Sequence, residues 1–382
     1  MRLAFLTPDW TPNGGVATHV RLVSAALAAA GHDVRVFYRN PSDGTEVTGV
    51  SIELLKSSTN AATDQIMSFR PDVAHFHAFN DVALEGRVLT EFRAVKTLHM
   101  FDFCPSGTKF HHALDRNCVF ETSAACVPRQ AYLRCTLSKR PSVWWHQYRK
   151  ATQLNALNRA IPKVIVASEF VKAEAVRTGY APAHVAVVPY FTSLSASAAA
   201  PKQNHVLFVG RLTREKGVDL LLEALARLTG DWSCTIVGDG MAAADLRQDA
   251  ARLGITPRVT FAGWLTGSAL EAAFAAASVV VVPSRWPEPF GIVGLEAMAH
   301  RRPVVAFRVG GIPEWLADGA TGFAIPPFDT RAFGRQLQWL FAHPAESAAM
   351  GAAGRARVER EFDSRTHLGR LTPIYEELRD RR

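Results

Sequence analysis

Two long stretches of the sequence repeat one order of elements: an apolar strand, a glycine-bearing loop, a helix and a second apolar strand. The first stretch has a strand at 3–6, a glycine cluster at 12–15, a helix at 16–30 and a strand at 34–38. The second stretch begins with a strand at 205–210. A strand–helix–strand unit places its two strands in parallel, with the helix on one face of the sheet. The sequence therefore predicts an α/β chain built on parallel sheets.

Further short apolar runs extend both patterns. In the first half the expected strands cover 73–77, 94–99, 164–167 and 185–188. In the second half they cover 233–237, 259–262, 279–282, 304–306 and 322–325, with helices at 217–228, 241–253 and 292–299. A segment rich in Ser, Ala, Pro and Lys, residues 193–203, separates the halves and is typical of a linker.

These patterns predict two α/β domains of similar size. The expected boundaries are residues 1–190 for the first domain, 191–204 for the linker and 205–361 for the second domain, followed by a helical tail over 362–382. In two-domain chains of this kind such a tail can pack back on the first domain. A ligand cleft between the carboxyl ends of two facing parallel sheets is the expected site.

Composition excludes several other classes. Hydrophobic residues make up 48% of the 382 residues and charged residues 20%, which is typical of globular and not of disordered chains. No apolar run reaches the ~18 residues of a membrane-spanning helix, and the opening apolar run is too short and too soon broken for a signal peptide. Five cysteines do not make a secreted disulfide scaffold. We therefore expect a cytoplasmic protein.

The net charge of +8 is local. Residues 129–177 contain ten Lys and Arg against two acids, Glu169 and Glu174, whereas 33 basic and 33 acidic residues cancel over the rest of the chain. A single basic window indicates one anionic partner surface and not nucleic-acid binding.

Aromatic residues lie inside this basic window. Trp144, Trp145 and Tyr148 stand among its Lys and Arg, and on a helix Trp144, Tyr148, Ala151 and Leu154 would share one face. Basic side chains beside such aromatics suit an anionic membrane surface. The alternative is a core helix of the first domain with charged flanks, and both interpretations stay open.

Two loops carry residues suited to phosphate. Gly14 and Gly15 lie between the first strand and the first helix, where glycine allows close approach of a ligand and the helix N-terminus favours an anion. The loop that opens at Gly210 carries Arg211 and Lys216, two cations that together can neutralise a diphosphate. The alternatives are a tight turn without a ligand and a solvated loop.

The most informative stretch joins a loop to a helix. Glu288 lies in the loop that follows an apolar strand, and Glu296 lies about one turn inside the helix. Two carboxylates at this spacing can address different parts of one polyhydroxylated ligand. The backbone amides of Gly291, Ile292 and Val293 at the helix start are donors suited to phosphate oxygens.

With these motifs in place, the chain resembles the retaining, nucleotide-sugar-dependent glycosyltransferases of family 4, which have the GT-B fold with two Rossmann-like domains. The resemblance runs from Met1 to about Tyr375 and is specific because several motifs occur together in the family's order. The matching positions are Gly14-Gly15 with 18–20, residues 31–36, Gly210, Arg211, Lys216 and Gly217, Glu288 and Glu296, and residues 309–314.

The resemblance implies a nucleoside-diphosphate sugar, with UDP or GDP as the nucleotide, bound in the second domain as co-substrate and without a cofactor. It implies that Arg211 and Lys216 stabilise the leaving diphosphate. It further implies that Glu288 orients the transferred sugar and that Glu296 accepts hydrogen bonds from the ribose. The other donor-binding positions that it indicates are Gly14, Gly15, Gly210, Gly238, Trp264, Leu265, Phe290, Gly291, Ile292 and Val293.

The resemblance also implies that His99 contacts the donor sugar. The family often has Asp or Asn directly after this histidine, whereas this chain has Met100 there and Asp102 three positions on from His99. A histidine that ends a strand is otherwise more often structural. Retention of anomeric configuration, by front-face attack assisted by the donor phosphate, is implied as well. The chain has no Asp-x-Asp motif, in agreement with metal-independent chemistry.

Four cysteines are grouped in the first half. Cys104, Cys118, Cys126 and Cys135 fall within 32 residues, a grouping that is a weak candidate for a structural zinc site. No Cys-x-x-Cys pair occurs among them, and buried free thiols are the favoured alternative.

Together these features predict a glycosyltransferase whose first domain binds a glycan or lipid-linked acceptor. Cell-surface polysaccharide or glycolipid synthesis, in the cytoplasm or at the inner face of the plasma membrane, is the setting that the resemblance implies. The alternative is an inactive subunit of the same fold that binds nucleotide or glycan and supports a partner, against which the complete set of motif residues argues. A cofactor-bearing sugar phosphorylase would need a Schiff-base lysine, and no lysine has a recognisable context for one.

Overall fold

The computed structural model of the protein describes residues 1–11, 14–40, 46–136, 138–194 and 201–380. These residues form two compact units. Unit 1 contains Met1–Tyr190 and the tail from Ser364, and unit 2 contains Phe191–Asp363. The second unit thus begins within the predicted linker, of which residues 195–200 lie outside the described part.

Unit 1 is built on a parallel sheet of seven strands in the order β3-β2-β1-β4-β5-β8-β9. The chain moves from β1 outward to β3 and then returns to the other side of β1 as β4, so the strand order reverses between β1 and β4. The strands are β1 (Arg2–Asp9), β2 (Asp33–Asn40), β3 (Val50–Leu54), β4 (Val73–His77), β5 (Ala94–Leu98), β8 (Lys163–Val166) and β9 (Val185–Val187).

Helices cover this sheet, and several begin at a side-chain cap. Ser58, Asp81 and Ser168 each accept a hydrogen bond from a backbone amide in the first turn of the helix that follows. The helices are α1 (Gly15–Ala29), α2 (Thr59–Phe69), α3 (Val82–Glu91), α5 (Pro141–Ala160) and α6 (Glu169–Arg177), with a short 3-10 turn at Pro182–His184.

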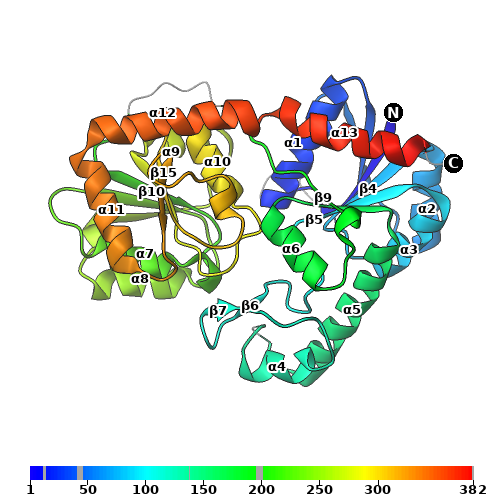
Figure 1. Ribbon diagram of the computed structural model, residues 1–382, viewed down its shortest axis with the longest axis horizontal. Coiled ribbons are helices and arrows are strands. Elements are labelled where there is room, and N and C mark those ends of the chain that lie inside the picture. Colours follow the sequence, from blue (N-terminus) through cyan, green and yellow to red (C-terminus); the bar gives the residue numbers. More distant parts are fainter. Residues whose placement is uncertain (12–13, 41–45, 137, 195–200, 381–382) are drawn as a thin grey trace. The chain divides into compact units, whose positions relative to one another are not determined.

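Between β5 and α5 the chain leaves the sheet and has little regular structure. It forms a two-stranded antiparallel hairpin, β6 (Phe110–His111) with β7 (Arg116–Asn117), and the short helix α4 (Cys126–Tyr132). In Figure 1 this excursion lies at one end of α5, and α3 lies at the other end of that helix. It contains all four of the grouped cysteines.

The C-terminal helix α13 (Ser364–Asp380) belongs to unit 1 and runs beside α1 (Figure 1). Tyr375 is fully buried, and its hydroxyl lies 2.6 Å from Nδ1 of His75 on β4. The Nδ1 of His367 donates to the carbonyl of Pro189 at 2.8 Å. The C-terminal helix starts at Ser364, two residues after the start of the predicted tail at 362–382, because the preceding helix ends at Glu361 with Phe362 as its C-cap.

Unit 2 is a parallel sheet of six strands in the order β12-β11-β10-β13-β14-β15. The central strand β13 is four valines, all buried, which is the pattern of a strand covered by helices on both faces. The strands are β10 (His205–Val209), β11 (Ser233–Val237), β12 (Val259–Gly263), β13 (Val279–Val282), β14 (Val304–Phe307) and β15 (Gly322–Ile325).

The helices of unit 2 alternate with these strands, as the sequence pattern predicts. They are α7 (Val218–Leu225), α8 (Ala243–Arg252), α9 (Gly267–Ala276), α10 (Ile292–Ala299), α11 (Thr330–Ala342) and α12 (Pro344–Glu361), with 3-10 turns at Arg214–Lys216, Thr256–Arg258 and Ile312–Glu314. In the described parts of the chain, no helix combines the length and the apolar character needed to cross a bilayer.

Candidate active site

The carboxyl edge of the sheet in unit 2 brings together the loops that carry most of the predicted site residues. Parallel strands all end at this edge, so the loops after β10, β11, β13 and β14 meet there. Backbone hydrogen bonds join neighbouring loops: Leu212 N donates to Asp239 O, Arg285 N to Glu215 O and Gly311 N to Glu288 O, each at 2.8 Å.

Two glycines allow these loops to approach one another closely. Gly217 has φ of 66°, and a Cβ at this position would lie 2.0 Å from the carbonyl oxygen of Pro283. Gly310 has φ of 58°, and a Cβ there would lie 2.1 Å from the carbonyl oxygen of Glu288. Any other residue would push the loops apart. Gly217 thereby fixes the position of Lys216 against the loop that carries Glu288.

Lys216 and Glu288 form a partly buried ion pair. The Lys216 Nζ lies 2.7 Å from Oε1 of Glu288, and the Ser284 hydroxyl donates to the same oxygen at 2.5 Å. The Lys216 Nζ also lies 5.5 Å from the centroid of the Trp286 ring. The Glu288 side chain is 5% exposed and the Lys216 side chain 22%, so solvent reaches the pair from the lysine side.

The pair keeps Glu288 ionised. Burial is the largest single effect and by itself raises the pKa of Glu288. The charge of Lys216 and hydrogen bonds from Lys216, Ser284 and Trp286 together outweigh it, so the pKa is lowered from its usual value. Ser284 and Trp286 were not predicted from the sequence, although both lie on the loop that carries Glu288.

The pKa of Glu296 is shifted in the opposite direction to that of Glu288. Burial, and then the nearby charge of Glu271, raise the pKa of Glu296 to about 7. The Nε2 of His300 lies 2.7 Å from Glu271 Oε2, and its Nδ1 donates to the backbone carbonyl of Glu296 at 2.7 Å. The carboxyl group of Glu296 therefore changes its protonation near neutral pH, where a ligand with hydroxyl groups would meet either form.

The first turn of α10 offers backbone amides to a ligand. The helix starts after Gly291, which has φ of 86°, and no side chain caps its N-terminus. The amides of Ile292 and Val293 are therefore donors of the kind that bind phosphate. Phe290 is buried, and its carbonyl accepts a hydrogen bond from Trp315 Nε1 at 2.5 Å, so this residue supports the loop.

The other predicted donor-site positions of unit 2 lie at the same edge of the sheet. Gly210 and Arg211 follow β10, Gly238 follows β11, and Trp264 and Leu265 follow β12. Arg211 is exposed, and within the described residues its side chain makes no hydrogen bond or ion pair. The Trp264 side chain is 42% exposed. A cation and an indole ring are thus available to a ligand at this edge.

Gly14 and Gly15 lie where the sequence predicts, at the start of α1 in unit 1. Gly14 precedes the helix with φ of 101°, and no side chain caps the N-terminus. Among the described residues, no atom lies within 4 Å of a Cβ placed at either glycine, although the backbone conformation at Gly14 favours glycine. Pro12 and Asn13 of the predicted cluster lie outside the described residues.

His99 lies directly after β5, with a ring that is 5% exposed. Its Nε2 is 3.1 Å from Nδ1 of His77, and its Nδ1 is 2.6 Å from the hydroxyl of Tyr190. Both ring nitrogens are therefore engaged inside unit 1. A hydrogen bond from either ring nitrogen to a sugar would have to replace one of these two contacts, so the predicted sugar contact of His99 stays a prediction.

His99 belongs to a cluster of buried histidines. Each ring centroid of the cluster lies within 6.0 Å of at least one other, as for His19 and His99 at 5.4 Å and His75 and His77 at 3.9 Å. Burial lowers the pKa of every member, to about 3 for His99 and about 4 for His367. The other members, whose pKa values burial also lowers well below the usual value, are His19, His75 and His77.

The sequence analysis did not identify this cluster. The available signal was His75 and His77 at alternate positions of one strand, which places both side chains on the same face of the sheet. His19 and His367 join them only through the packing of α1 and α13. Asp102 lies near this region, and its Oδ2 has no hydrogen-bond partner in the described residues. Burial raises the pKa of Asp102 to about 6, against the opposing charges of Lys96 and Lys150.

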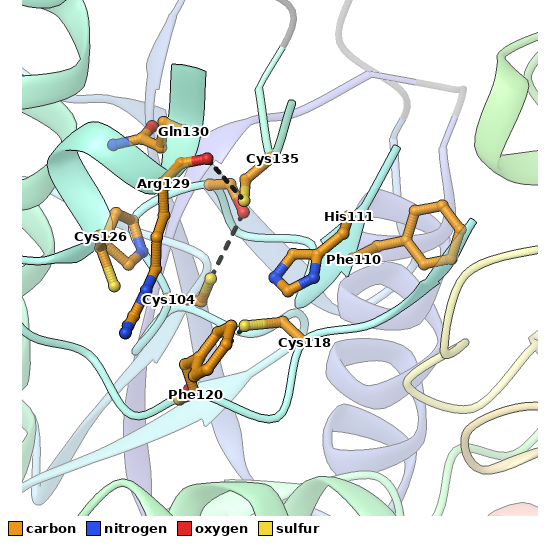
Figure 2. A pocket seen from close by; sticks show the side chains of 11 residues that line it. Cys104, Phe110, His111, Cys118, Phe120, Cys126, Arg129, Gln130 and Cys135 are labelled. Carbon is orange, nitrogen blue, oxygen red and sulfur yellow. Dashed lines mark hydrogen bonds between the residues drawn. The ribbon is translucent and has the colours of Figure 1, made fainter. Parts of the chain in front are cut away.

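The four grouped cysteines line one small cavity in the excursion of unit 1, of about 20 Å³ (Figure 2). All are free thiols, and burial is the main reason why the pKa of Cys135 rises to about 12. In the part of the chain that the structure describes, no three Cys, His, Asp or Glu side chains are arranged to hold a metal ion. The arrangement therefore differs from the zinc site considered from the sequence. The cysteines are Cys104, Cys118, Cys126 and Cys135.

The helix expected within the basic window is α5. Ala151 and Leu154 are buried in unit 1, and Trp144 and Tyr148 are half-buried, so the predicted shared face is the inner one. Trp145 lies on the other side and is 51% exposed. The basic window therefore supplies both a core-facing helix surface and an exposed basic and aromatic surface.

Comparison with solved structures gives the fold class. Sucrose-phosphate synthase from Thermosynechococcus elongatus superposes with a TM-score of 0.76 at 24% identity, covering 99% of this chain and 98% of the other. HepE from Anabaena, solved with UDP-glucose, superposes with a TM-score of 0.74 at 17% identity, covering 99% and 100%. The protein has the GT-B fold, with one Rossmann-like half in each unit.

Comparison of sequences gives the family. The model described as Glycosyltransferase Family 4 matches residues 13–195, and the model described as Glycosyl transferases group 1 matches residues 191–357. Glycogen synthase from Mycobacterium tuberculosis is 27% identical over 98% of this chain and 94% of its own. Alpha-D-kanosaminyltransferase from Streptomyces kanamyceticus is 36% identical over 45% of each chain. The chain belongs to the family 4 glycosyltransferases.

Proposed function

We propose that the protein transfers a sugar from a nucleoside-diphosphate sugar, with UDP or GDP as the nucleotide, to a glycan or lipid-linked acceptor. We further propose that it does so with retention of anomeric configuration and without a metal ion. The observation that carries this proposal is the partly buried pair of Lys216 and Glu288, 2.7 Å apart beside the start of α10, which no side chain of the described residues caps. The complex of HepE with UDP-glucose supports a nucleotide-sugar donor.

In this proposal, cations and amides of unit 2 stabilise the leaving diphosphate. Negative charge builds on the diphosphate as the bond to the sugar breaks, and preformed donors at that position lower the barrier. Lys216 is held in place by Glu288, whereas Arg211 is exposed and can close on the phosphates when they bind. The amides of Ile292 and Val293 add donors at the positive end of α10.

The two glutamates have different roles. Glu288 stays ionised and is fixed by Lys216 and Ser284, so it can orient the hydroxyls of the transferred sugar. Glu296 receives the ribose hydroxyls in its carboxylate form, in which both oxygens accept hydrogen bonds. Trp264 lies on the loop after β12, where its exposed ring can stack on the base.

The acceptor is proposed only as a class. A relative at 28% identity over 94% of this chain is named D-inositol 3-phosphate glycosyltransferase, and a second relative is named glycogen synthase. Their names describe a small phosphorylated acceptor and a polysaccharide. The polysaccharide falls within the proposed class of glycan acceptors, whereas inositol phosphate is neither a glycan nor lipid-linked and represents a second acceptor type among the relatives.

Thermal stabilisation by a panel of nucleoside diphosphates and nucleotide sugars tests the donor site. A ligand that binds only the folded state raises the melting temperature by mass action, so one base should stand out. Release of nucleoside diphosphate is then measured with and without a chelator, and equal rates are expected. The anomeric configuration of the product tests retention.

The outcomes of this panel are distinct. Stabilisation by a nucleotide without any release of nucleoside diphosphate, even with acceptors supplied, would favour the inactive subunit. Loss of activity in chelator would contradict the metal-independent mechanism. No stabilisation by any nucleotide would contradict the donor site itself.

A further inference from the structure

Unit 1 contains an open groove that the proposed donor site does not use. Its volume is about 690 Å³, and it lies between the loop that leads from β4 into α3 and one exposed face of α5. The loop contributes Asn80 and Asp81. The helix contributes Trp145, His146, Arg149 and Lys150, which share a face because they are spaced about one turn apart.

The groove lies at the edge of the sheet where parallel α/β units bind ligands. β4 ends at His77, and the groove begins three residues later, so it stands at the carboxyl edge of the sheet. The loop after β4 borders the switch point between β1 and β4, while the second wall of the groove is α5 and not the loop after β1. The groove therefore shares one loop with the crevice at the switch point.

The charges on the loop side of the groove are already neutralised within the fold. Asp81 Oδ2 lies 2.5 Å from Arg39, and its Oδ1 caps α3 by accepting from Leu84 N at 3.0 Å. Asn80 Oδ1 accepts a hydrogen bond from the fully buried Lys96 at 3.3 Å. Lys96 is in turn paired with Glu85 at 2.9 Å, so this side adds little net charge to the groove.

The helix side, in contrast, carries cations without anionic contacts. Arg149 and Lys150 are exposed, and neither side chain makes a hydrogen bond or ion pair within the described residues. The acid that faces Lys150 is Asp102, whose charge Lys150 stabilises through space without direct contact. His146 on the same face is exposed as well. The groove is therefore a positively charged pocket, and its complement is an anion.

An exposed aromatic ring stands beside these cations. The Trp145 side chain is 51% exposed, and its ring centroid lies 5.8 Å from that of Tyr148. A flat ring next to a hydrated cation pair offers an apolar face for the C–H side of a sugar and hydrogen-bond donors for an anionic group. A simple inorganic anion would use only the cations.

We propose that this groove binds an anionic saccharide, with Arg149 and Lys150 on its phosphate or carboxylate and Trp145 under its sugar ring. The proposal deepens the proposed function and rests on it in one respect, namely that the bound saccharide is the acceptor. Binding of an anionic saccharide to the groove can be tested independently of donor binding.

The test measures binding of glucose 6-phosphate, glucuronic acid, glucose and inorganic phosphate to the full chain by titration calorimetry. The variants are Arg149→Ala/Lys150→Ala and Trp145→Ala. The matched control is Lys139→Ala/Arg140→Ala, which removes the same charge from exposed positions near the start of α5 that do not line the groove. Nucleoside diphosphate binding to each variant reports on unit 2 and on correct folding.

We expect at least one of the two anionic sugars to bind in preference to glucose, with an affinity that falls as salt is added. Arg149→Ala/Lys150→Ala should weaken that binding by about tenfold or more, because charge-assisted hydrogen bonds are lost. The Lys139→Ala/Arg140→Ala control should stay within about twofold, since screening limits distant charges. Trp145→Ala should weaken the sugar phosphate or uronic acid and leave inorganic phosphate unchanged. If the variants weaken binding of glucose 6-phosphate, the groove recognises phosphate. If they weaken binding of glucuronic acid, it recognises carboxylate.

Several results would overturn the proposal. One is equal binding of the anionic sugars to the wild type and to Arg149→Ala/Lys150→Ala, and another is no binding of either sugar at millimolar concentration. A third is loss of binding to phosphatidylglycerol vesicles in that variant while no anionic sugar binds, which would assign the surface to a membrane. If nucleotide binds but no anionic sugar does, the groove assignment fails and the proposed function stands. If an anionic sugar binds the groove but no nucleotide binds, the groove assignment stands and the proposed function fails.

Discussion

In unit 2 the buried carboxylate of Glu288 keeps its charge because Lys216 lies 2.7 Å away, whereas in unit 1 five buried histidines contact one another and the hydroxyls of tyrosine and threonine. The first arrangement holds a charge ready beside a ligand site. The second keeps polar rings neutral in the core. Both arrangements lose stability as the pH falls, because the folded protein lowers the pKa of Glu288 and of each histidine. The losses fall in different pH ranges, since the usual pKa is 4.5 for glutamate and 6.5 for histidine.

This difference bears on how each unit serves a bound substrate. A preformed ion pair costs no reorganisation when charge develops nearby, so it suits the stabilisation of a leaving group. A neutral histidine cluster ties β4, β5, α1 and α13 together and fixes the loop after β5 in position. The residues that bind a ligand in unit 1 are then expected outside this cluster, as in the groove along α5.

The largest expected effect is acid destabilisation of unit 1. The folded pKa values of the five histidines lie below their unfolded value near 6.5, so this source of stability is complete above pH 6.5 and is lost as the pH falls below it. Each histidine contributes up to about 1.4 kcal/mol per pH unit. Hydrogen exchange at pH 7 and pH 5 should show unit 1 opening before unit 2.

Glu296 should give unit 2 the opposite pH dependence of stability in the same measurement. Its pKa is raised in the folded state, so its contribution to the stability of unit 2 grows as the pH falls through about 7. Exchange that increases first in unit 2, or a stability of unit 1 that does not change between pH 7 and pH 5, would contradict the neutral state assigned to the histidines.

The second prediction concerns catalysis. Glu288→Gln should lower turnover by about a hundredfold or more, because it removes the charge that orients the sugar and holds Lys216. Nucleoside diphosphate affinity should stay within about tenfold, since Arg211 and the amides of α10 remain. Steady-state rates and titration calorimetry on the same preparation separate the two effects. Equal losses in both would show that the assignments of Glu288 and Glu296 are wrong.

The third prediction concerns Glu296. Glu296→Ala should weaken nucleotide binding by about 1–3 kcal/mol through the loss of charged hydrogen bonds to the ribose. In the wild type, affinity should fall as the pH is lowered through about 7, because the accepting carboxylate form is lost. Glu296→Gln should remove this pH dependence, and a dependence that persists in Glu296→Gln would assign the titration to another group.

The smallest expected effect concerns the cysteine cavity. All five thiols of the chain should react with a thiol reagent after unfolding without reductant, and purified protein should contain no stoichiometric zinc. Cys104→Ser should change the free energy of unfolding by no more than about 1 kcal/mol, since it is a small change at a half-buried site. If the wild type contained one equivalent of zinc and Cys104→Ser contained none, the cavity would be a metal site.

Much of unit 2 could be predicted from the sequence because its signals are local. The alternation of valine-rich strands and helices predicts its parallel sheet, and the glycines around Lys216 and Glu288 mark loops at one edge. Unit 1 was less predictable. The edge strand β3, of five residues and only partly buried, has weak periodicity, and the two-residue strands β6 and β7 are too short to have any.

The sequence by itself determined the fold class, the order of the two halves and the loops that carry Arg211, Lys216, Glu288 and Glu296, because each depends on residues close together in the chain. The tertiary structure alone decided the rest. His75 meets Tyr375 across 300 positions. The pKa of Glu296 is raised by burial and then by Glu271, whereas the pKa of Glu288 is lowered because Lys216, Ser284 and Trp286 outweigh its burial. Burial and partner charge are properties of packing, and no periodicity along the chain encodes them.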